Sequence, residues 1–279
     1  MNYAKIVKNY SKTFYYSSLF FPKEIREEVF LLYSFVRRID DLVDRKNSNL
    51  EEFNEFGKEF DEAWNGKDLK NNLLKDFIFL AKKRNFPKAW IKDFFQAQKL
   101  DLKKKTYKNF KELQKYTYGV AGTVGLFMAK ILKLPKHTYA NAIKLGQAMQ
   151  IINCCRDILE DYSLGRVYLP EEDFKKFGLN YSNFLRKEKY QRLASLLRFE
   201  IKRAFEIENQ ARKSFVFFKN KRSLFAVKTA ADLYHKIGEK ILKNPKVVLS
   251  QKQKFVTKID LIKVLFRNFI LIYVLNEKI

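Results

Sequence analysis

Three aspartates lie close together in RRIDDLVD, a short stretch of an otherwise strongly basic chain. Asp40 and Asp44 are four residues apart, so their carboxylates share one face of a helix. Ion pairing with nearby arginines on the surface is the simplest explanation, worth only about 0.3–0.5 kcal/mol per pair. Against it, the aspartates end the predicted helix, where the helix dipole disfavours negative charge, and the turns before them are apolar. Alone, this cluster favours neither explanation.

A second polar stripe occupies the stretch NCCRDILED. Asn153, Asp157 and Asp161 follow one another at intervals of four residues, and Gln150 lies three residues before Asn153. The other positions of this predicted helix are mostly apolar, so aligned polar groups there need a partner or a function. Pairing with the acid four residues later accounts for Arg156, but it leaves the aligned amide and carboxylates unexplained. The second stripe therefore favours a functional site.

Facing carboxylate stripes on two helices form a good Mg²⁺ site, because Mg²⁺ takes oxygen ligands and shares them with substrate phosphates. Arginines beside such a site can bind phosphate oxygens directly. The two histidines of the chain cannot furnish a nitrogen-rich site, so we expect a hard ion, Mg²⁺ or alternatively Mn²⁺. Departure of a diphosphate from an allylic carbon needs this neutralisation of charge. The stripes therefore suit a diphosphate leaving group.

Long helices must position these stripes, and helical periodicity runs through almost the whole chain. Nine glycines and five prolines are few for a protein of strands and turns, so the composition predicts an all-α fold. No linker or change in composition divides residues 1–279, which we expect to form a single domain. Helices are expected near residues 23–44, 50–64, 69–84, 88–104, 110–132, 138–165, 182–218, 223–243 and 256–275.

The formal net charge of +25 admits three explanations. A lysine-rich, solvated surface is the simplest. Attraction to an anionic partner, either a diphosphate substrate or acidic lipid headgroups, is the second. Nucleic acid ranks last, because the sequence has no zinc-finger spacing, no RNA-recognition signature and no isolated basic arm. We therefore expect no nucleic-acid partner.

The sequence favours a cytoplasmic location. The adjacent cysteines, Cys154 and Cys155, do not suggest a disulfide framework, and the N-terminus does not resemble a signal peptide. The best membrane candidate, residues 261–275, is too short to span a bilayer and carries Lys263 and Arg267. We expect a last core helix there. The alternative is a helix that lies in the interface at the inner face of the membrane.

Four stretches together resemble the squalene and phytoene synthase family, namely YSKTFYYSSLFFP, RRIDDLVD, YTYGVAGTVG and GQAMQIINCCRDILEDYSLGRVYLP. They occur in the order and spacing of the family and span about residues 10 to 175. One aspartate box is shared with chain-elongating prenyltransferases and terpene cyclases, whereas NCCRDILED followed by GRVYLP is specific to this family. The resemblance implies an all-helical isoprenoid synthase fold with a central cavity, in which two prenyl diphosphates are joined head to head.

The resemblance also implies roles for individual residues. Tyr116 corresponds to a tyrosine tied to proton handling or to stabilisation of a cation. The metal ligands, and with them the catalytic aspartates, correspond to Asp40, Asp44, Asn153, Asp157 and Asp161. The substrate-binding positions correspond to Ser11, Lys12, Thr13, Arg37, Gln150, Asn153, Arg156 and Tyr234, with a looser correspondence at Lys246 and Lys254.

The resemblance leaves the substrate and the product open. Coupling without a hydride gives phytoene or dehydrosqualene, and coupling with NADPH gives squalene. Ser18 is small and lies where one end of the cavity is expected, which favours the twenty-carbon geranylgeranyl diphosphate and phytoene. Phe30 favours the shorter farnesyl diphosphate, with dehydrosqualene, presqualene diphosphate or squalene as the product. A non-catalytic chaperone for prenyl lipids is a remote alternative, and the oligomeric state stays open.

Glycines interrupt the helix expected at 110–132. Gly119, Gly122 and Gly125 lie in GVAGTVG, and glycine inside a helix costs about 1 kcal/mol relative to alanine. Close packing between helices is one explanation. The other is a break that makes room for a prenyl chain and brings Tyr116 to the cavity, and the resemblance favours it.

Overall fold

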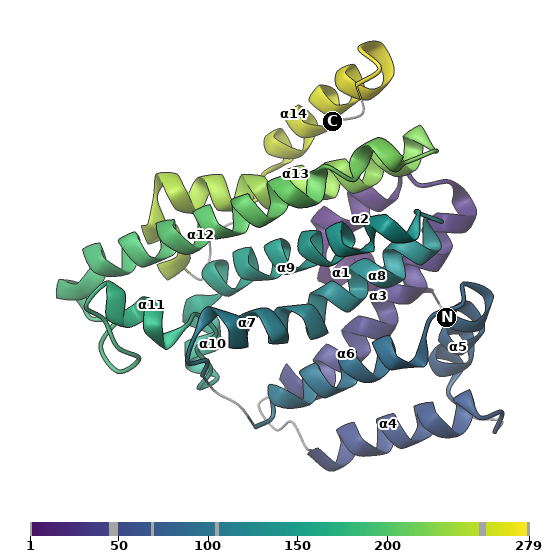
Figure 1. Ribbon diagram of the computed structural model, residues 1–279, viewed down its shortest axis with the longest axis horizontal. Coiled ribbons are helices and arrows are strands. Elements are labelled where there is room, and N and C mark those ends of the chain that lie inside the picture. Colours follow the sequence, from purple (N-terminus) through teal and green to yellow (C-terminus); the bar gives the residue numbers. More distant parts are fainter. Residues whose placement is uncertain (1, 45–49, 68–69, 104–105, 251–254, 278–279) are drawn as a thin grey trace.

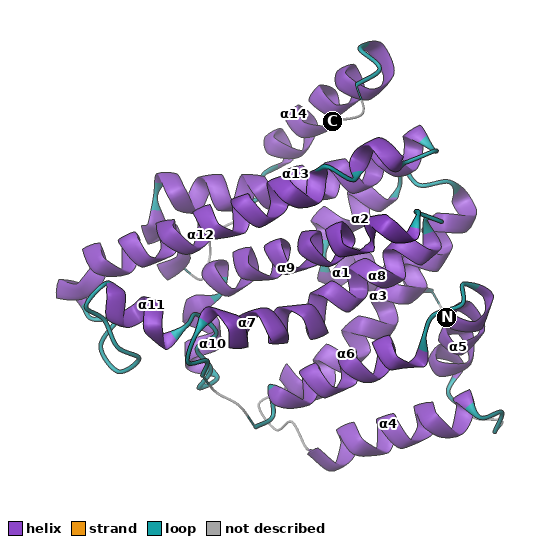
Figure 2. Ribbon diagram, in the orientation of Figure 1, coloured by secondary structure: helices purple, strands orange, loops and turns teal. Residues whose placement is uncertain are grey.

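The computed structural model shows a bundle of helices (Figure 1), and Figure 2 shows the same bundle coloured by secondary structure. In the described residues the only extended pairing is an isolated parallel bridge between Thr106 and Val167. The prediction of an all-α fold is confirmed. The described residues are 2–44, 50–67, 70–103, 106–250 and 255–277, without the side chain of Asp44.

The elements follow one another along the chain with short connections. Up to residue 131 they are α1 (Tyr3–Tyr10), α2 (Lys12–Ser18), α3 (Lys23–Asp44), α4 (Leu50–Trp64), α5 (Asn72–Lys83), α6 (Lys88–Leu100), α7 (Phe110–Thr117), the π-helix η1 (Tyr118–Gly122) and α8 (Thr123–Ile131). The later ones are η2 (Lys136–Thr138), α9 (Tyr139–Arg156), α10 (Ile158–Ser163), α11 (Glu171–Lys176), η3 (Lys187–Lys189), α12 (Tyr190–Arg212), η4 (Phe215–Phe217), α13 (Lys221–Lys243), η5 (Pro245–Leu249), α14 (Lys258–Phe269) and the π-helix η6 (Ile270–Val274).

Local capping explains several helix boundaries. Asn71 and Asn220 accept hydrogen bonds from backbone N–H groups in the first turns of α5 and α13. Thr257 forms a capping box with Asp260 at the start of α14. The sequence analysis gives no helix before residue 23, yet α1 and α2 are present. Helices this short are marginal in isolation, and these two are stabilised by packing on α3 and α13.

The helix expected at 138–165 is divided into α9 and α10, so the prediction of one uninterrupted helix is wrong. Asp157 separates the two helices, with φ of −98° and ψ of 11°. Its N–H still donates to the carbonyl of Asn153 at 2.8 Å, and the N–H of Asp161 donates to its carbonyl at 2.9 Å. Because these bonds continue across the break, the polar periodicity is preserved, and periodicity alone could not reveal the break.

α9 runs through the middle of the bundle and packs on α8, α12 and α13 (Figure 1). Glycine permits the close approach of its neighbours, because a Cβ on Gly125 would lie 2.2 Å from the carbonyl oxygen of Ala142. A Cβ on Gly146 would lie equally close, 2.2 Å, to the carbonyl oxygen of Ala121. The π-helix η1 also interrupts the helical segment at Tyr118–Gly122. Close packing and a helix irregularity are therefore both present.

Candidate active site

A cavity of about 530 Å³ lies between α2, α3, α8, α9 and α13. Its lining changes in character along α9, from Ala142 and Leu145 near the start to Asn153 and Asp157 at the end. At 1.5 Å per residue, Ala142 and Asp157 lie about 22 Å apart along this helix. The cavity therefore has a polar end and an apolar end, and it suits an elongated molecule with a polar head.

RRIDDLVD at the end of α3, the first acidic box, contributes Asp40 to the polar end. The Asp40 carboxylate accepts a hydrogen bond from the amide of Gln98 on α6. Asp41 is turned toward Arg37, whose Nε donates to its carboxylate at 2.9 Å. The guanidinium of Arg37 also lies 4.4 Å from the ring centroid of Tyr10. These contacts hold Arg37 in the lining of the cavity.

NCCRDILED, the second acidic box, spans the break between α9 and α10. Its residues Asn153, Asp157 and Asp161 all line the cavity. Arg156 forms a two-point ion pair with Asp157, in which Nε donates at 2.6 Å. Asn153 donates through Nδ2 to Gln150 at 3.3 Å, but its buried Oδ1 has no hydrogen-bond partner among the described residues. A buried acceptor without a partner is uncommon in folded proteins, so it points to a ligand at this position.

The two arginines at the polar end stay charged although they are partly buried. Burial lowers the pKa of Arg37, but its hydrogen bonds to the Asp41 carboxylate and the charges of Asp41 and Asp40 outweigh it, and the net pKa rises. Burial likewise lowers the pKa of Arg156, and the hydrogen bond and charge of Asp157 raise it further than burial lowers it. The polar end therefore holds two fixed cations that can bind phosphate oxygens.

The donors at the polar end suit a hard divalent ion. The carboxylates of Asp40, Asp157 and Asp161 and the Oδ1 atom of Asn153 are all oxygen ligands of the kind that Mg²⁺ takes. Among the side chains that the structure describes, no three His, Cys, Asp or Glu residues form a cluster that could hold an ion. This donor set fits an ion that completes its coordination with water and substrate phosphates.

A wall of tyrosines lies beside a buried carboxylate at the end of α6. Asp101 accepts hydrogen bonds from the hydroxyls of Tyr116, at 2.7 Å, and Tyr168, at 2.9 Å, and all three residues line the cavity. The rings of Tyr116 and Tyr168 stack with centroids 5.1 Å apart, and Tyr107 packs against both. Burial, and then the charge of Asp101, raise the pKa of Tyr116 and of Tyr168. Both phenols therefore stay protonated.

The apolar end of the cavity bears on the length of the ligand. Ser18 is buried, lines the cavity, and has a hydroxyl without a hydrogen-bond partner among the described residues. Phe30 is also buried, but it stacks on Tyr15 with ring centroids 5.8 Å apart and does not belong to the lining. Of the two residues that the sequence analysis weighed for chain length, only Ser18 contacts the cavity.

The cavity brings together most of the predicted site residues, from segments far apart in the sequence. Ser11 lies at the boundary between α1 and α2, where its hydroxyl accepts a hydrogen bond from the N–H of Phe14 at 3.3 Å. Tyr234 comes from α13, more than two hundred residues later. The predicted residues in the lining are Ser11, Arg37, Asp40, Tyr116, Gln150, Asn153, Arg156, Asp157, Asp161 and Tyr234.

The other predicted site residues are not in the lining. Lys12 is exposed and Thr13 half-buried, and both lie in the first turn of α2. Lys246 is exposed on η5, with its Nζ 4.9 Å from the centroid of a tyrosine ring. Lys254 and the side chain of Asp44 lie outside the described residues, although the backbone of Asp44 forms the last residue of α3.

Gln98, Asp101 and Tyr168 are among the polar residues of the lining that the sequence analysis did not identify. Gln98 and Asp101 are three residues apart at the end of α6, and both are buried although polar. That spacing on one helix face was the available signal. Tyr168 lies in GRVYLP, where Arg166 donates to the carbonyl of Val43 at 2.6 Å. This bond ties the loop to the end of α3 and so to the first acidic box.

Comparison with known proteins gives a consistent result. The family model described as squalene/phytoene synthase matches residues 7–260. The chloroplastic phytoene synthase of an Oncidium hybrid cultivar is 31% identical over 255 residues, which are 86% of this chain and 60% of that protein. The 15-cis-phytoene synthase of Synechocystis sp. is 30% identical over 258 residues, which are 86% of this chain and 75% of that protein. The chain thus spans less than two thirds of the plant relative.

Solved structures show the same helical arrangement. A dehydrosqualene synthase superposes with a TM-score of 0.84 at 26% identity, over 95% of this chain and 93% of that one. A squalene synthase from Alicyclobacillus acidocaldarius superposes with a TM-score of 0.77 at 22% identity, over 86% of this chain and 91% of that one. The prediction of an isoprenoid synthase fold is confirmed.

Proposed function

Because the chain belongs to the squalene/phytoene synthase family, we propose that it joins two prenyl diphosphates head to head in a Mg²⁺-dependent reaction. The observation that carries the proposal is the cavity, which joins oxygen ligands and two charged arginines to an apolar end about 22 Å away. A prenyl diphosphate has the same division between an anionic head and a long apolar tail. Members of this family are prenyltransferases, which supports the same chemistry.

At the polar end, Arg37 and Arg156 bind the diphosphate oxygens in our proposal. Each guanidinium is already held by a neighbouring carboxylate, so it is oriented before the substrate arrives. When bound, Mg²⁺ neutralises the charge that develops on the departing diphosphate. The residues proposed to hold it are Asp40, Asn153, Asp157 and Asp161, with Asp44 from the end of α3.

The proposed reaction has two ionisations. The C–O bond of one substrate breaks, its electron pair leaves with the diphosphate, and an allylic cation remains. The double bond of the second substrate attacks this cation, and loss of a proton closes a cyclopropane ring. The resulting cyclopropylcarbinyl diphosphate loses its own diphosphate from the carbon next to the ring, rearranges and loses a second proton. Each linear hydrocarbon product is therefore accompanied by two diphosphates and two protons.

The tyrosine wall suits the cationic and proton-transfer steps. Its stacked rings present π faces, which attract a carbocation without forming a bond to it. The phenols of Tyr116 and Tyr168 are protonated donors, and Asp101 is the base to which both are hydrogen-bonded. In our proposal Asp101 takes up a proton relayed through Tyr116.

We propose geranylgeranyl diphosphate as the substrate and phytoene as the product, which is the first step of carotenoid synthesis. Relatives at about 30% identity are phytoene synthases, Ser18 leaves room at the apolar end, and Phe30 does not occupy it. The second candidate is coupling of farnesyl diphosphate, favoured by the structural likeness to a dehydrosqualene synthase. NADPH takes part only if the product is squalene.

The proposal is tested by offering purified protein geranylgeranyl or farnesyl diphosphate with Mg²⁺, or with Mn²⁺ in parallel, with and without NADPH. Mass spectrometry should identify a hydrocarbon of the mass of phytoene, formed without NADPH and abolished by EDTA. Coupled product from farnesyl diphosphate alone would favour the second candidate. Absence of coupled product from both substrates contradicts the proposed function.

Ser18→Phe tests the assignment of chain length. Adding a ring at the apolar end should shift the preference, measured as a ratio of kcat/KM values, toward farnesyl diphosphate by at least about 10-fold. Phe30→Leu is the control, because Phe30 is outside the lining and its replacement should leave the ratio unchanged. An unchanged ratio in Ser18→Phe contradicts the role of this position.

The proposed product is a hydrocarbon, so it moves to a bilayer rather than into water. In the part of the chain that the structure describes, no helix combines the length and hydropathy needed to cross a membrane. We propose a cytoplasmic enzyme that associates with the inner face of the membrane, with prenyl diphosphates and no nucleic acid among its partners.

A further inference from the structure

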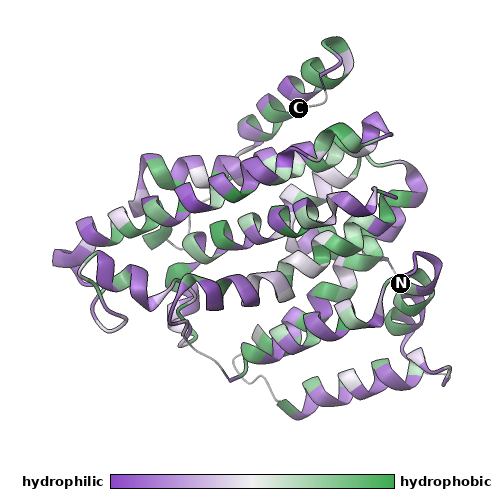
Figure 3. Ribbon diagram, viewed as in Figure 1, coloured by the Kyte–Doolittle hydropathy of each residue, from purple (hydrophilic) through white to green (hydrophobic). Residues whose placement is uncertain are grey.

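The outer face of α14 carries a stripe of exposed apolar side chains. Ile259, Ile262, Phe266 and Phe269 are spaced by three and four residues, so they lie on one face of the helix and form what we call the outer stripe. Ile262 is 64% exposed and Phe266 is 67% exposed. Figure 3 shows apolar positions on α14, at the edge of the bundle. A contiguous apolar surface of this kind indicates an interaction site.

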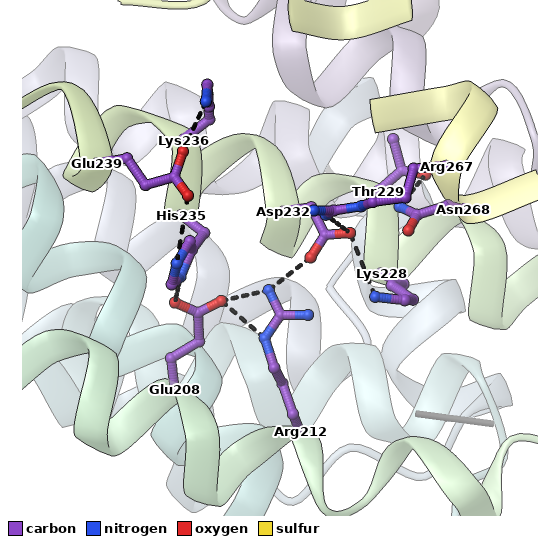
Figure 4. Close-up of polar contacts among 10 residues, drawn as sticks. All are labelled: Glu208, Arg212, Lys228, Thr229, Asp232, His235, Lys236, Glu239, Arg267 and Asn268. Carbon is purple, nitrogen blue, oxygen red and sulfur yellow. Dashed lines mark hydrogen bonds and ion pairs between the residues drawn. The ribbon is translucent and has the colours of Figure 1, made fainter. Parts of the chain in front are cut away.

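The opposite face of α14 is fixed to the bundle. Asn268 is fully buried, and Arg267 reaches the buried carboxylate of Asp232 on α13 at 2.8 Å (Figure 4). In the first turn of the helix, Asp260 pairs with Lys240 of α13 at 2.6 Å. The outer stripe therefore belongs to a helix that is anchored to α13 near both of its ends. Its side chains are exposed while the helix is docked on the bundle.

The charges beside the outer stripe are positive. Lys258 and Lys263 adjoin it in the sequence, and Arg267 beside it is exposed but already paired with Asp232. Asp260, the only acid of α14, is engaged in the helix cap and in the ion pair with α13. An apolar stripe bordered by cations is typical of a helix that lies in the interface of an anionic bilayer. Pairing of two copies through the same stripe would bring like charges together without acids to compensate them.

The outer stripe is continuous with the wall of the cavity. The ring of Phe269 contacts Tyr273, Tyr273 contacts Phe225, and Phe225 contacts Phe20, with centroids 5.3, 5.9 and 4.7 Å apart. Phe225 belongs to the same apolar cluster as Phe218, which lines the cavity. This surface therefore adjoins the apolar lining of the cavity through shared packing.

We infer that the outer stripe of α14 docks on the surface of an anionic lipid bilayer and holds the apolar wall of the cavity next to the membrane. Burial of the isoleucine and phenylalanine side chains supplies the attraction, and the flanking cations favour acidic headgroups. The benefit of this placement for a hydrocarbon product rests on the proposed function. The docking itself rests on the exposure and the charges of α14.

Flotation of the purified protein with liposomes tests the inference. The wild type should float with vesicles of mixed phosphatidylglycerol and phosphatidylcholine, and markedly less with phosphatidylcholine alone. Phe266→Glu should lower the partition coefficient by at least about 10-fold, because it replaces an apolar anchor by a negative charge. Phe79→Glu is the matched control, because Phe79 is 71% exposed on α5, which lies far from α14 in Figure 1. Its binding should equal that of the wild type.

Equal flotation of the wild type and Phe266→Glu overturns the inference, as does equal loss in both variants. A wild-type dimer that Phe266→Glu converts to a monomer in sedimentation velocity also overturns it, because a second copy then covers the outer stripe. Circular dichroism and turnover of detergent-dispersed substrate should show that Phe266→Glu is folded, and Ile262→Glu provides a second variant. A wild type that floats but makes no coupled product supports docking and contradicts the proposed function alone.

Discussion

The polar end of the cavity and the ion cluster between α12, α13 and α14 are both dense in charge, but they differ in how their polar atoms are satisfied. In the ion cluster, shown in Figure 4, Glu208 and Asp232 are buried and both pair with Arg212. Lys228 and Arg267 pair with Asp232 as well. Both buried carboxylates are thus neutralised by cations of the same cluster, and the cluster does not line the cavity.

The polar end of the cavity is incomplete by comparison. Asn153 has a buried oxygen without a partner among the described residues, and Asp157, although paired with Arg156, faces an open volume. Charge density alone therefore does not locate a functional site in this protein. At the polar end, the open polar groups face the cavity. In the ion cluster both carboxylates are paired with cations away from the cavity, although the neighbouring Asn268 also has a buried Oδ1 without a partner among the described residues.

Removing the central acid of the ion cluster should have the largest effect, and on stability. Asp232→Asn removes the carboxylate shared by the largely buried Arg212 and Lys228 and the exposed Arg267, so the free energy of unfolding should fall by about 3–5 kcal/mol. Urea denaturation measures this change. Turnover per folded molecule should be retained. An unchanged urea midpoint in Asp232→Asn would show that the ion cluster does not stabilise the fold.

The same variant has an expected pH signature. Burial raises the pKa of Asp232, but the charges of Arg212, Lys228 and Arg267 together lower it more, so the net pKa is below the ordinary value. The carboxylate therefore stabilises the fold fully above its unfolded pKa of about 3.9, and this contribution is lost as the pH falls through the folded pKa. The stability difference between wild type and Asp232→Asn should narrow below about pH 4. A difference that widens on acidification contradicts the assignment.

At the polar end of the cavity, the corresponding change should affect activity. Asp157→Asn keeps the shape of the side chain and removes its charge, so kcat should fall by about 10²–10³-fold. Stability should change less than in Asp232→Asn, because the Asp157 side chain is 31% exposed. Steady-state kinetics and urea denaturation, measured on both variants, give the two readouts. Full turnover by Asp157→Asn would contradict the assignment of the site.

Asp101, the carboxylate beside the tyrosine wall, shares a property with each region. It is buried like the carboxylates of the ion cluster, but it lines the cavity. Asp101→Asn should lower kcat by about 10²-fold and alter the pH dependence of kcat/KM, because it removes a base hydrogen-bonded to Tyr116. Asp101→Glu should restore part of the activity. A loss of stability with an unaltered pH profile would instead place Asp101 with the structural ion cluster.

The smallest expected effect concerns the orientation of Asp40. Gln98→Leu removes the amide that donates to its carboxylate, so kcat/KM should fall by about 3- to 10-fold. Gln147→Leu is the matched control, because Gln147 is also buried but donates to the backbone of Gln114 and is not in the lining. Equal effects of the two variants on kcat/KM would show that Gln98 is structural.

Much of the site could be predicted because helical periodicity is local. The four-residue spacing that aligned Asn153, Asp157 and Asp161 in the sequence also places all three in the cavity lining. Arg37 and Asp40, three residues apart on α3, likewise both lie in the cavity lining. The helix at 50–64 was predicted with the boundaries that α4 has. In each case the residues that decide the structure lie within one or two turns of each other.

Other features depended on partners far along the chain. Asp101 and Tyr168 meet only because the fold brings the end of α6 to the loop after α10. The last helix was predicted as a core helix, yet Phe266 on α14 is largely exposed while Asn268 is buried, because α13 covers only one face. No spacing within α14 could reveal which of its two apolar faces would be covered.

By itself, the sequence determined the helical class, the two acidic boxes and the family, since these follow from residue types at short spacings. Only the tertiary structure decided which polar groups are completed by other protein groups and which remain open to a ligand. Whether a buried polar atom has a hydrogen-bond or ion-pair partner depends on its neighbours in space. For Asn153 and Asp232, packing between helices determines those neighbours.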